Sequence, residues 1–201
     1  MIVLDCKQLG PEWFAARAGV PSASNFDKIV TTKGEPSAQA KNYMYQLAGE
    51  RLTGAKTETH QSAAMQRGIE LEAEARSLYE LMTDETVQTV GICYPNEDKK
   101  YSCSPDGLVG EDGGTEIKCP LIHTHVGYLL DGKLPTAYFQ QVHGSMLVAG
   151  RKWWDFMSYY PGIKPFIIRV QRDEQFCKKL HAQLIKFCME LDKTVGKLMN
   201  L

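Results

Sequence analysis

The residues best suited to chemistry lie between positions 102 and 120, where the sequence reads SCSPDGLVGEDGGTEIKCP. Asp106 and Glu116 flank a predicted hairpin, and strand pairing across it brings the two carboxylates close together. Because side chains alternate along a strand, Glu116 and Lys118 share one face. Ile117 then points into the core and leaves its carbonyl at the edge of the site. The pattern predicts a cluster of acidic oxygens beside one ammonium group.

A metal-dependent phosphodiesterase needs such a cluster. Mg²⁺ prefers carboxylate, carbonyl and water oxygens in an octahedral array, and Mn²⁺ accepts the same ligands. The ion polarises a phosphoryl oxygen and lowers the pKa of its bound water, and a second ion steadies the leaving oxygen. We therefore expect two or three converging carboxylates and a base or orienting cation. Asp106, Glu116 and Lys118 supply most of that set.

A third carboxylate lies upstream, on a long helix predicted for residues 62–83. The apolar residues of this helix gather in one arc: Met65, Ile69 and Tyr79, with Leu71, Ala75, Leu78 and Met82 beside them. Glu72 projects within this arc and so faces inward. It either completes the site or forms an ion pair with Arg76 one turn on.

The rest of the chain alternates between helices and strands. Helices are expected over 22–30 (with Ser22 as N-cap), 37–54, 121–130 and 136–148, and after a cap at Asp173. Strands are expected within 85–94 and over 100–104, 107–109, 115–119, 151–160 and 166–171, with a turn at Gly113 and Gly114 and a polar loop over 55–61. This order indicates an α/β fold with a central mixed β-sheet flanked by helices and a helical N-terminal part. The 201 residues suit one domain over 1–201.

Composition sets outer limits on the function. The formal net charge is −1, so there is no general basic surplus and any phosphate-binding surface must be local. None of the six cysteines falls in a C-x-x-C pair, which favours free, mostly buried thiols in a reducing cytosol over a zinc site. No signal peptide and no membrane-spanning run is expected.

Several separated blocks, in a common order, resemble the PD-(D/E)xK nucleases of the phage lambda exonuclease and YqaJ-like viral recombinase family, the alkaline exonucleases of phage recombination. The resemblance runs from Trp13 to the final helix. The blocks are WFAAR at 13–17 with SAS at 22–24, GIELE at 68–72 with AR at 75–76, CSPDG at 103–107, EIKCP at 116–120, and Gln141 with Ser145 and Met146.

This resemblance implies a restriction-endonuclease-like core and a processive 5′→3′ exonuclease that acts on the ends of linear double-stranded DNA. Family members leave a 3′ single-stranded tail for a single-strand annealing protein, and they form ring-shaped homotrimers. The resemblance also implies a phage- or prophage-encoded protein in the cytoplasm of a bacterial host.

The resemblance further implies roles for single residues in catalysis. Asp106 and Glu116 would bind Mg²⁺, at two ions per site, with help from the Ile117 carbonyl. Glu72 would hold a metal or its water. Lys118 would orient or deprotonate the attacking water, and Gln141 would support the site.

DNA-binding roles are carried over in the same way. Arg17 and Ser24 match a pocket for the 5′ phosphate, which suits the forked guanidinium. Trp13 either stacks near the DNA end or belongs to the core. Met65 takes the place of an aliphatic residue that wedges the terminal base pair. Where lambda exonuclease has a further arginine this chain has Thr124, which leaves a histidine, His123 or His125, as a replacement.

Two other interpretations stay open at this point. The same core also serves restriction and repair endonucleases, which cut within a duplex and yield discrete fragments. The second is a DNA-end binder with a vestigial site, although the intact Asp106, Glu116 and Lys118 argue against this interpretation. A metal-dependent activity assay separates the three.

Overall fold

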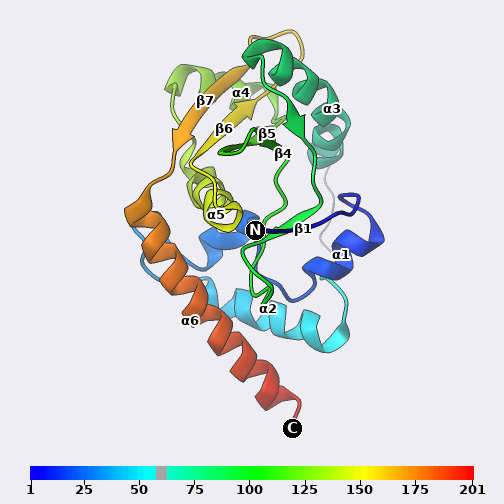
Figure 1. The fold of residues 1–201 in the computed structure, drawn as a ribbon, viewed down its shortest axis with the longest axis vertical. Coiled ribbons are helices and arrows are strands. Elements are labelled where there is room, and N and C mark those ends of the chain that lie inside the picture. The colour runs from blue at the N-terminus through cyan, green and yellow to red at the C-terminus, as the bar shows by residue number, and fades with distance from the viewer. Residues whose placement is uncertain (58–62) are drawn as a thin grey trace.

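The computed structural model describes residues 1–57 and 63–201 (Figure 1). The elements follow in this order: β1 (Ile2–Leu4), α1 (Pro11–Arg17), η1 (Ala23–Lys28), α2 (Ala40–Thr53), α3 (Ala63–Thr83), β2 (Val87–Gln88), β3 (Ile92–Tyr94), β4 (Gly107–Val109), β5 (Gly113–Lys118), α4 (Ile122–Asp131), η2 (Thr136–Tyr138), α5 (Phe139–Ala149), β6 (Trp153–Ser158), β7 (Phe166–Gln171) and α6 (Glu174–Leu198). Short 3₁₀ turns are labelled η.

The central sheet has the strand order β2-β4-β5-β6-β7. All neighbouring pairs are antiparallel except β5 and β6, which run parallel and are joined by a crossover through α4 and α5. A separate antiparallel pair joins β1 to β3. The expected mixed sheet is therefore confirmed, and it includes the predicted meander of β2, β4 and β5.

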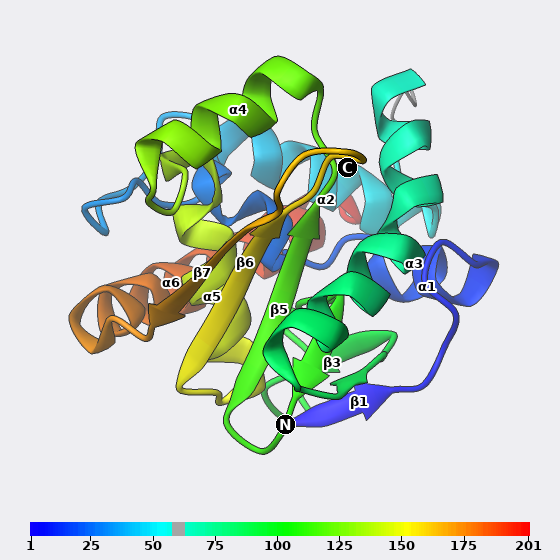
Figure 2. The same ribbon diagram turned by 90° about the horizontal axis from the view of Figure 1, so that it is seen from above.

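Helices cover both faces of the sheet (Figure 2). On one face, Ala75 and Tyr79 of α3 pack against Ile117 and Met157. On the other, α5, α6, α2 and η1 enclose the larger core, which includes Trp154 and other buried aromatic residues. The alternation predicted for β5 is confirmed, because Ile117 is buried on the α3 face while Glu116 bonds to α5.

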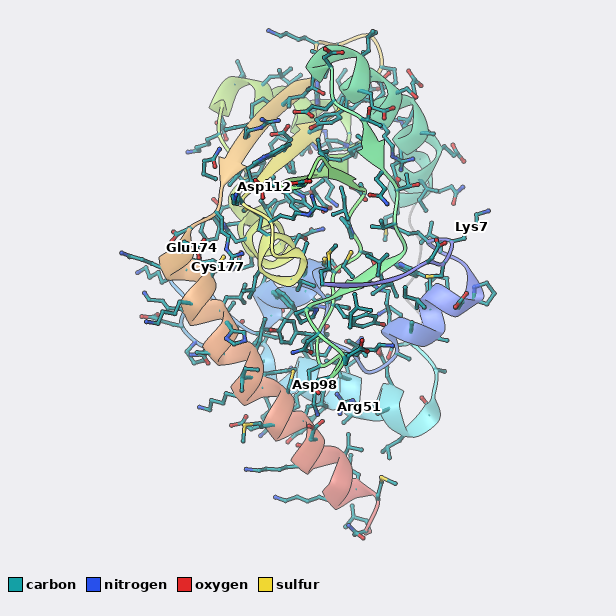
Figure 3. All side chains as sticks on the ribbon, in the orientation of Figure 1. Lys7, Arg51, Asp98, Asp112, Glu174 and Cys177 are labelled. Atoms are coloured by element: carbon teal, nitrogen blue, oxygen red, sulfur yellow. The ribbon has the colours of Figure 1, made fainter. Side chains whose placement is uncertain are left out.

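The last helix is anchored as the sequence predicts. The Asp173 side chain accepts a hydrogen bond from the Phe176 backbone nitrogen at 2.9 Å, which is the N-cap contact. In the first turns of α6, Cys177 is buried and donates to the His143 carbonyl of α5, whereas Glu174 is exposed (Figure 3). All six cysteines are free, and four of them are buried.

The two glycines expected to form a turn instead lie inside β5. A Cβ on Gly113 would come within 2.1 Å of the Trp153 ring, and one on Gly114 within 2.3 Å of the Trp154 ring. The residues are thus glycines because two tryptophans of β6 cover them. The turn comes earlier, at Gly110, where φ is +51°.

Other boundaries also differ from the predictions. Residues 23–28 form only a 3₁₀ helix, and Ser22 makes no capping bond because its hydroxyl accepts from Arg17 instead. Residues 100–104 meet their neighbours only through isolated bridges, α2 begins at Ala40, and the helix expected from residue 136 is a 3₁₀ turn followed by α5. The polar loop expected over 55–61 and the helix start at Ser62 extend into residues 58–62, outside the described residues.

Within the described parts of the chain, none of the helices combines the length and apolar character needed to cross a bilayer.

Candidate active site

The strand pairing of β4 with β5 brings the two predicted carboxylates together. Gly107 pairs with Thr115, so Asp106 and Glu116 are the next residues on the two strands. The Asp106 carboxylate accepts a hydrogen bond from the Ile117 backbone nitrogen at 2.6 Å. One acidic side chain therefore bridges from the start of β4 to the backbone of β5.

Glu116 is 2 % exposed and has an asymmetric set of partners. Its Oε1 accepts from Gln141 Nε2 of α5 at 2.5 Å and pairs with the Lys118 ammonium. Its Oε2 is buried without a hydrogen-bond partner. Burial raises the pKa of Glu116 to about 7, with Asp106 adding to the shift and Lys118 opposing it. A buried carboxylate oxygen without a hydrogen-bond partner, such as Oε2, lowers the stability of the fold unless a positive group contacts it.

Lys118 lies in the midst of these acidic groups. Burial acts to lower its pKa, but the charges of Glu116 and Asp106 outweigh burial and raise it. The ammonium therefore stays protonated at neutral pH. It also lies 5.4 Å from the centroid of the Tyr138 ring.

Glu72 has both of the environments considered from the sequence. Its carboxylate forms an ion pair with Arg76 one turn on. It also lines the same cavity as Asp106 and Lys118. Burial and the charge of Asp106 raise the pKa of Glu72, while Arg76 lowers it. The helix thus brings a third carboxylate to the site, already neutralised in part.

The donor chemistry fits a hard divalent cation. Within residues 1–57 and 63–201, no three His, Cys, Asp or Glu side chains are gathered as a ready ligand set. Yet Glu116 has a buried oxygen without a partner, and Asp106 and Ile117 beside it offer carboxylate and carbonyl oxygens. Oxygen donors of this kind are those that Mg²⁺ and Mn²⁺ take.

A cavity of about 1170 Å³ extends from these carboxylates to the N-terminal helices. It is lined from α1, η1, α3 and β5. All four residues predicted to contact DNA line it: Trp13, Arg17, Ser24 and Met65. Residues that are far apart in the sequence, such as Arg17, Met65 and Asp106, therefore share one cavity.

Arg17 lines the same cavity and is surrounded by serine hydroxyls. It is 7 % exposed, and its two terminal nitrogens donate to Ser104 at 3.0 Å, Ser22 at 3.1 Å and Ser24 at 3.3 Å. Its Nε is buried without a partner, and no carboxylate in the described residues forms an ion pair with it. A buried, unpaired guanidinium among hydroxyls is suited to an anion.

Trp13 belongs both to the core and to this pocket. Its ring is 8 % exposed, lies 4.2 Å from the Arg17 guanidinium carbon, and donates from Nε1 to Ser104 at 3.0 Å. The tryptophan therefore holds Arg17 from one side and fixes the serine that Arg17 uses.

Four residues near Arg17 or in the cavity lining were not assigned a functional role from the sequence, although Ser22 was expected to be an N-cap. Ser22 and Ser104 lay within the matched blocks, so a signal for them existed, but their hydroxyls meet Arg17 only in the folded chain. Lys28 and Lys56 also line the cavity, and no motif marks them.

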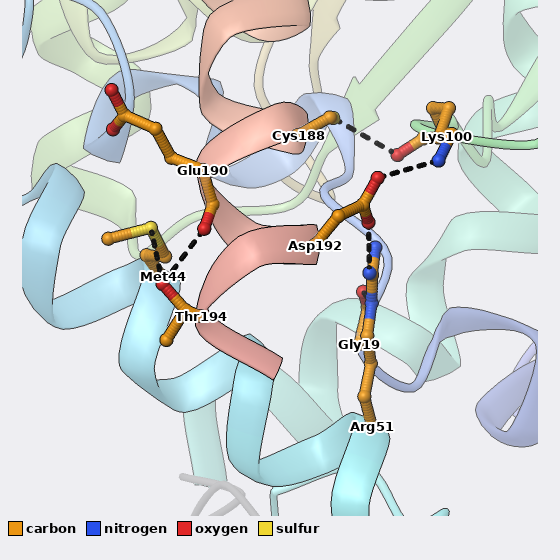
Figure 4. A network of polar contacts seen from close by, with 8 residues as sticks. All are labelled: Gly19, Met44, Arg51, Lys100, Cys188, Glu190, Asp192 and Thr194. Carbon is orange, nitrogen blue, oxygen red and sulfur yellow. Dashed lines mark hydrogen bonds and ion pairs between the residues drawn. The ribbon is translucent and has the colours of Figure 1, made fainter. Parts of the chain in front are cut away.

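The turn that follows Arg17 is clamped by α2. The Gly19 nitrogen donates to Glu50 at 2.9 Å, and Arg51 Nε donates to the Gly19 carbonyl at 2.9 Å. Asp192 of α6 in turn holds Arg51 at 2.6 Å and Lys100 at 2.7 Å (Figure 4). The last helix thus holds, through Arg51, the turn that follows Arg17.

His125 cannot replace the missing arginine. It is fully buried, and its ring nitrogens lie 2.8 Å from the Ser158 hydroxyl and 3.1 Å from the Lys164 carbonyl. Both polar atoms are therefore used inside the protein. His123 is exposed at the start of α4.

A mixed sheet that carries an aspartate before one strand and Glu-x-Lys on the next has the fold of the PD-(D/E)xK nucleases. The YqaJ-like viral recombinase domain profile matches residues 12–152. The chain belongs to this family. No curated protein is significantly similar to it in sequence.

Solved structures agree with this assignment. The chain is similar to LHK-Exo, an alkaline exonuclease from Laribacter hongkongensis, with 36% identity and a TM-score of 0.87 over 95% of this chain and 97% of that one. LHK-Exo in complex with dAMP gives 35% and 0.85 over the same shares. A phage related exonuclease from Haemophilus somnus 129PT shares the fold at 16% identity, with a TM-score of 0.71 over 89% of this chain and 96% of that one.

Proposed function

We propose that this protein is a metal-dependent exonuclease that degrades linear double-stranded DNA processively from 5′-phosphorylated ends. The observation that carries the proposal is the single cavity that is lined both by Asp106 and Lys118 and by Arg17, the guanidinium of which is bonded to serine hydroxyls. The similarity to an alkaline exonuclease at 36% identity supports the same reaction class. Residues 1–201 would act as one nuclease domain.

Asp106, Glu116 and the Ile117 carbonyl would hold Mg²⁺, with Mn²⁺ as a substitute, and Glu72 would hold a second ion or its water. When bound, the metal supplies Lewis acidity and a water of lowered pKa. Gln141 keeps the Glu116 carboxylate in place through the bond to Oε1. Lys118, which is protonated beside two carboxylates, orients the attacking water and neutralises the charge that develops on the phosphoryl oxygens.

The direction of digestion follows from the anion pocket. A terminal 5′ phosphate bound at Arg17, Ser24 and Ser104 directs the next phosphodiester toward Asp106 and Lys118. Trp13 and Met65 would contact the DNA end, Met65 as a wedge. A 3′ end carries no phosphate to bind there, so the pocket favours 5′→3′ digestion.

The wider assignments rest on the family. A chain of the viral recombinase family would leave 3′ single-stranded tails for an annealing protein during recombination. It would act as a homotrimeric ring around DNA, in the cytoplasm of a bacterial host, encoded by a phage or prophage. Sedimentation of the purified protein with and without duplex DNA measures the oligomeric state.

The decisive assay compares substrates that differ only in their ends. With Mg²⁺, linear duplex with 5′ phosphates should be digested progressively, and closed circular duplex should survive. Lys118→Ala and Asp106→Ala should abolish hydrolysis while the thermal transition is retained. Rapid cutting of closed circles would point to an endonuclease instead, and metal-dependent binding without hydrolysis would point to an end binder.

A further inference from the structure

Leu9 has a backbone conformation that leucine rarely adopts. Its φ is +63°, and it occupies the third position of a turn closed by the Gly10 nitrogen and the Lys7 carbonyl at 3.1 Å. Turns of this kind favour glycine at that position, because a Cβ is strained at positive φ. A strained backbone conformation persists where contacts with the rest of the fold fix it, and such residues cluster at functional sites.

The surroundings do hold this turn. The Gln8 side chain donates to the Val90 carbonyl at 2.8 Å and to the Pro105 carbonyl at 2.9 Å. Pro105 directly precedes Asp106, so the turn is tied to the strand end that carries the catalytic aspartate. In spite of this anchoring, the Leu9 side chain is 47% exposed. Packing of the Leu9 side chain in the core therefore does not explain why a leucine occupies this strained position.

Leu9 lines the same cavity as the active site, together with three other exposed apolar side chains. Phe14 comes from α1, and Met65 and Ile69 come from α3. Helices α1 and α3 both contribute to the lining of this cavity. The cavity is therefore lined by the acidic groups Glu72 and Asp106, by Arg17 and lysines, and by apolar side chains from elements that are distant in sequence.

This charge pattern identifies the occupant. If the 5′ phosphate is at Arg17 and the bond to be cut is at Asp106, one sugar and its base must lie between them. The deoxyribose and the phosphates meet the polar side chains, which leaves the base for the apolar ones. Every base has an apolar face, so such a contact accepts all four bases.

We propose that Leu9 and Phe14, together with Met65 and Ile69 of α3, form a slot for the base of the 5′-terminal nucleotide. The inference rests on the proposed function and deepens it. Leu9 is a positioning residue, since it contacts the base and not the reacting atoms. The strained turn is retained because glycine, which fits its backbone better, has no side chain to offer the base.

The test separates this contact from stability. Leu9→Gly suits the positive φ, so the midpoint of thermal unfolding should not fall. Asp84→Gly is the matched control, because Asp84 also has a positive φ, of +56°, and does not line the cavity. Phe14→Ala is a second variant that removes the partner side chain without touching the turn.

Binding is measured by fluorescence anisotropy, with chelator present so that nothing is hydrolysed. The probes are two 5′-phosphorylated duplexes, one with a normal terminal nucleotide and one with a tetrahydrofuran abasic residue there. The wild type and Asp84→Gly should bind the normal end roughly tenfold more tightly than the abasic one. That ratio should fall to about threefold in each single variant and to near unity in the double variant, because the two side chains contact the base independently.

Equal binding of both ends by the wild type would overturn the slot, as would an unchanged ratio in Leu9→Gly and Phe14→Ala. Digestion of linear duplex with Mg²⁺ is recorded separately. A wild type that prefers the normal end but digests nothing would refute the exonuclease and leave the slot supported.

Discussion

The affinity of the site for its metal should fall steeply below neutral pH, because Glu116 must lose its proton before it can bind a cation. Its burial among Asp106 and Glu72 raises its pKa to about 7. With that value, about one site in eleven is ionised at about pH 6, so the apparent affinity drops roughly tenfold, or about 1.4 kcal/mol, per pH unit. Above about pH 8 the carboxylate is ionised and the affinity should level off.

Calorimetric titration of the DNA-free protein with Mn²⁺ measures this dependence directly. Repeating it in buffers with different heats of ionisation counts the protons released, which should approach one per site at acidic pH and vanish at alkaline pH. Glu116→Gln is the control, because the weak Mn²⁺ binding that remains in this variant should depend much less on pH. Equal affinities at about pH 6 and about pH 8, or no proton release at the lower value, would refute the assignment of Glu116 as a ligand with a raised pKa.

The raised pKa of Glu116 also predicts how the free energy of unfolding changes with pH. Its folded pKa of about 7 lies above the ordinary value of 4.5, so between these values the folded protein keeps a proton that the unfolded chain releases. The contribution of Glu116 to the free energy of unfolding therefore falls as pH rises through this window. Metal should reverse the loss, and the thermal shift that it causes should be larger at alkaline pH.

Three further variants test the pocket and the fold. Arg17→Ala should reduce the preference for 5′-phosphorylated over hydroxyl ends about 10- to 100-fold, because a charge-assisted contact is lost, and should affect basal cleavage less. Initial rates on the two kinds of end measure this preference. A wild type that digests both ends at the same rate would contradict the phosphate pocket. Gly114→Ala should destabilise the fold by about 2–3 kcal/mol, because its Cβ meets the buried Trp154 ring at 2.3 Å; a denaturation midpoint equal to that of the wild type would contradict the close packing. Asp173→Ala should cost about 1 kcal/mol through the lost cap, as a drop in the same midpoint without a change in cleavage.

Local patterns in the sequence determined much of the carboxylate and lysine cluster around Asp106 and Glu116. Alternation on β5 is a property of any strand, so Glu116 and Lys118 could be assigned to one side and Ile117 to the other before the fold was known. The Asp173 cap and the long α3 with Glu72 facing inward follow from equally local rules. These features need no information from distant residues, and they agree with the structure.

Turns and caps were predicted less well, because their outcome depends on partners far away in the chain. Gly113 and Gly114 are typical turn residues, yet they lie in β5 because Trp153 and Trp154 need the room. Ser22 is a typical N-cap, yet Arg17 takes its hydroxyl. In both cases a tertiary contact outweighs a local preference of about 1 kcal/mol.

The sequence by itself determined which side chains could hold a metal and, through the ordered blocks, which family the chain resembles. Only the tertiary structure decided that Arg17 meets Ser104, that Glu116 is buried with an unpaired oxygen, and that Leu9 faces the cavity in a strained turn. The physical reason is that burial, pKa and the shape of a cavity arise from residues that are brought together by folding. No local pattern records which distant atoms will exclude water from a given side chain.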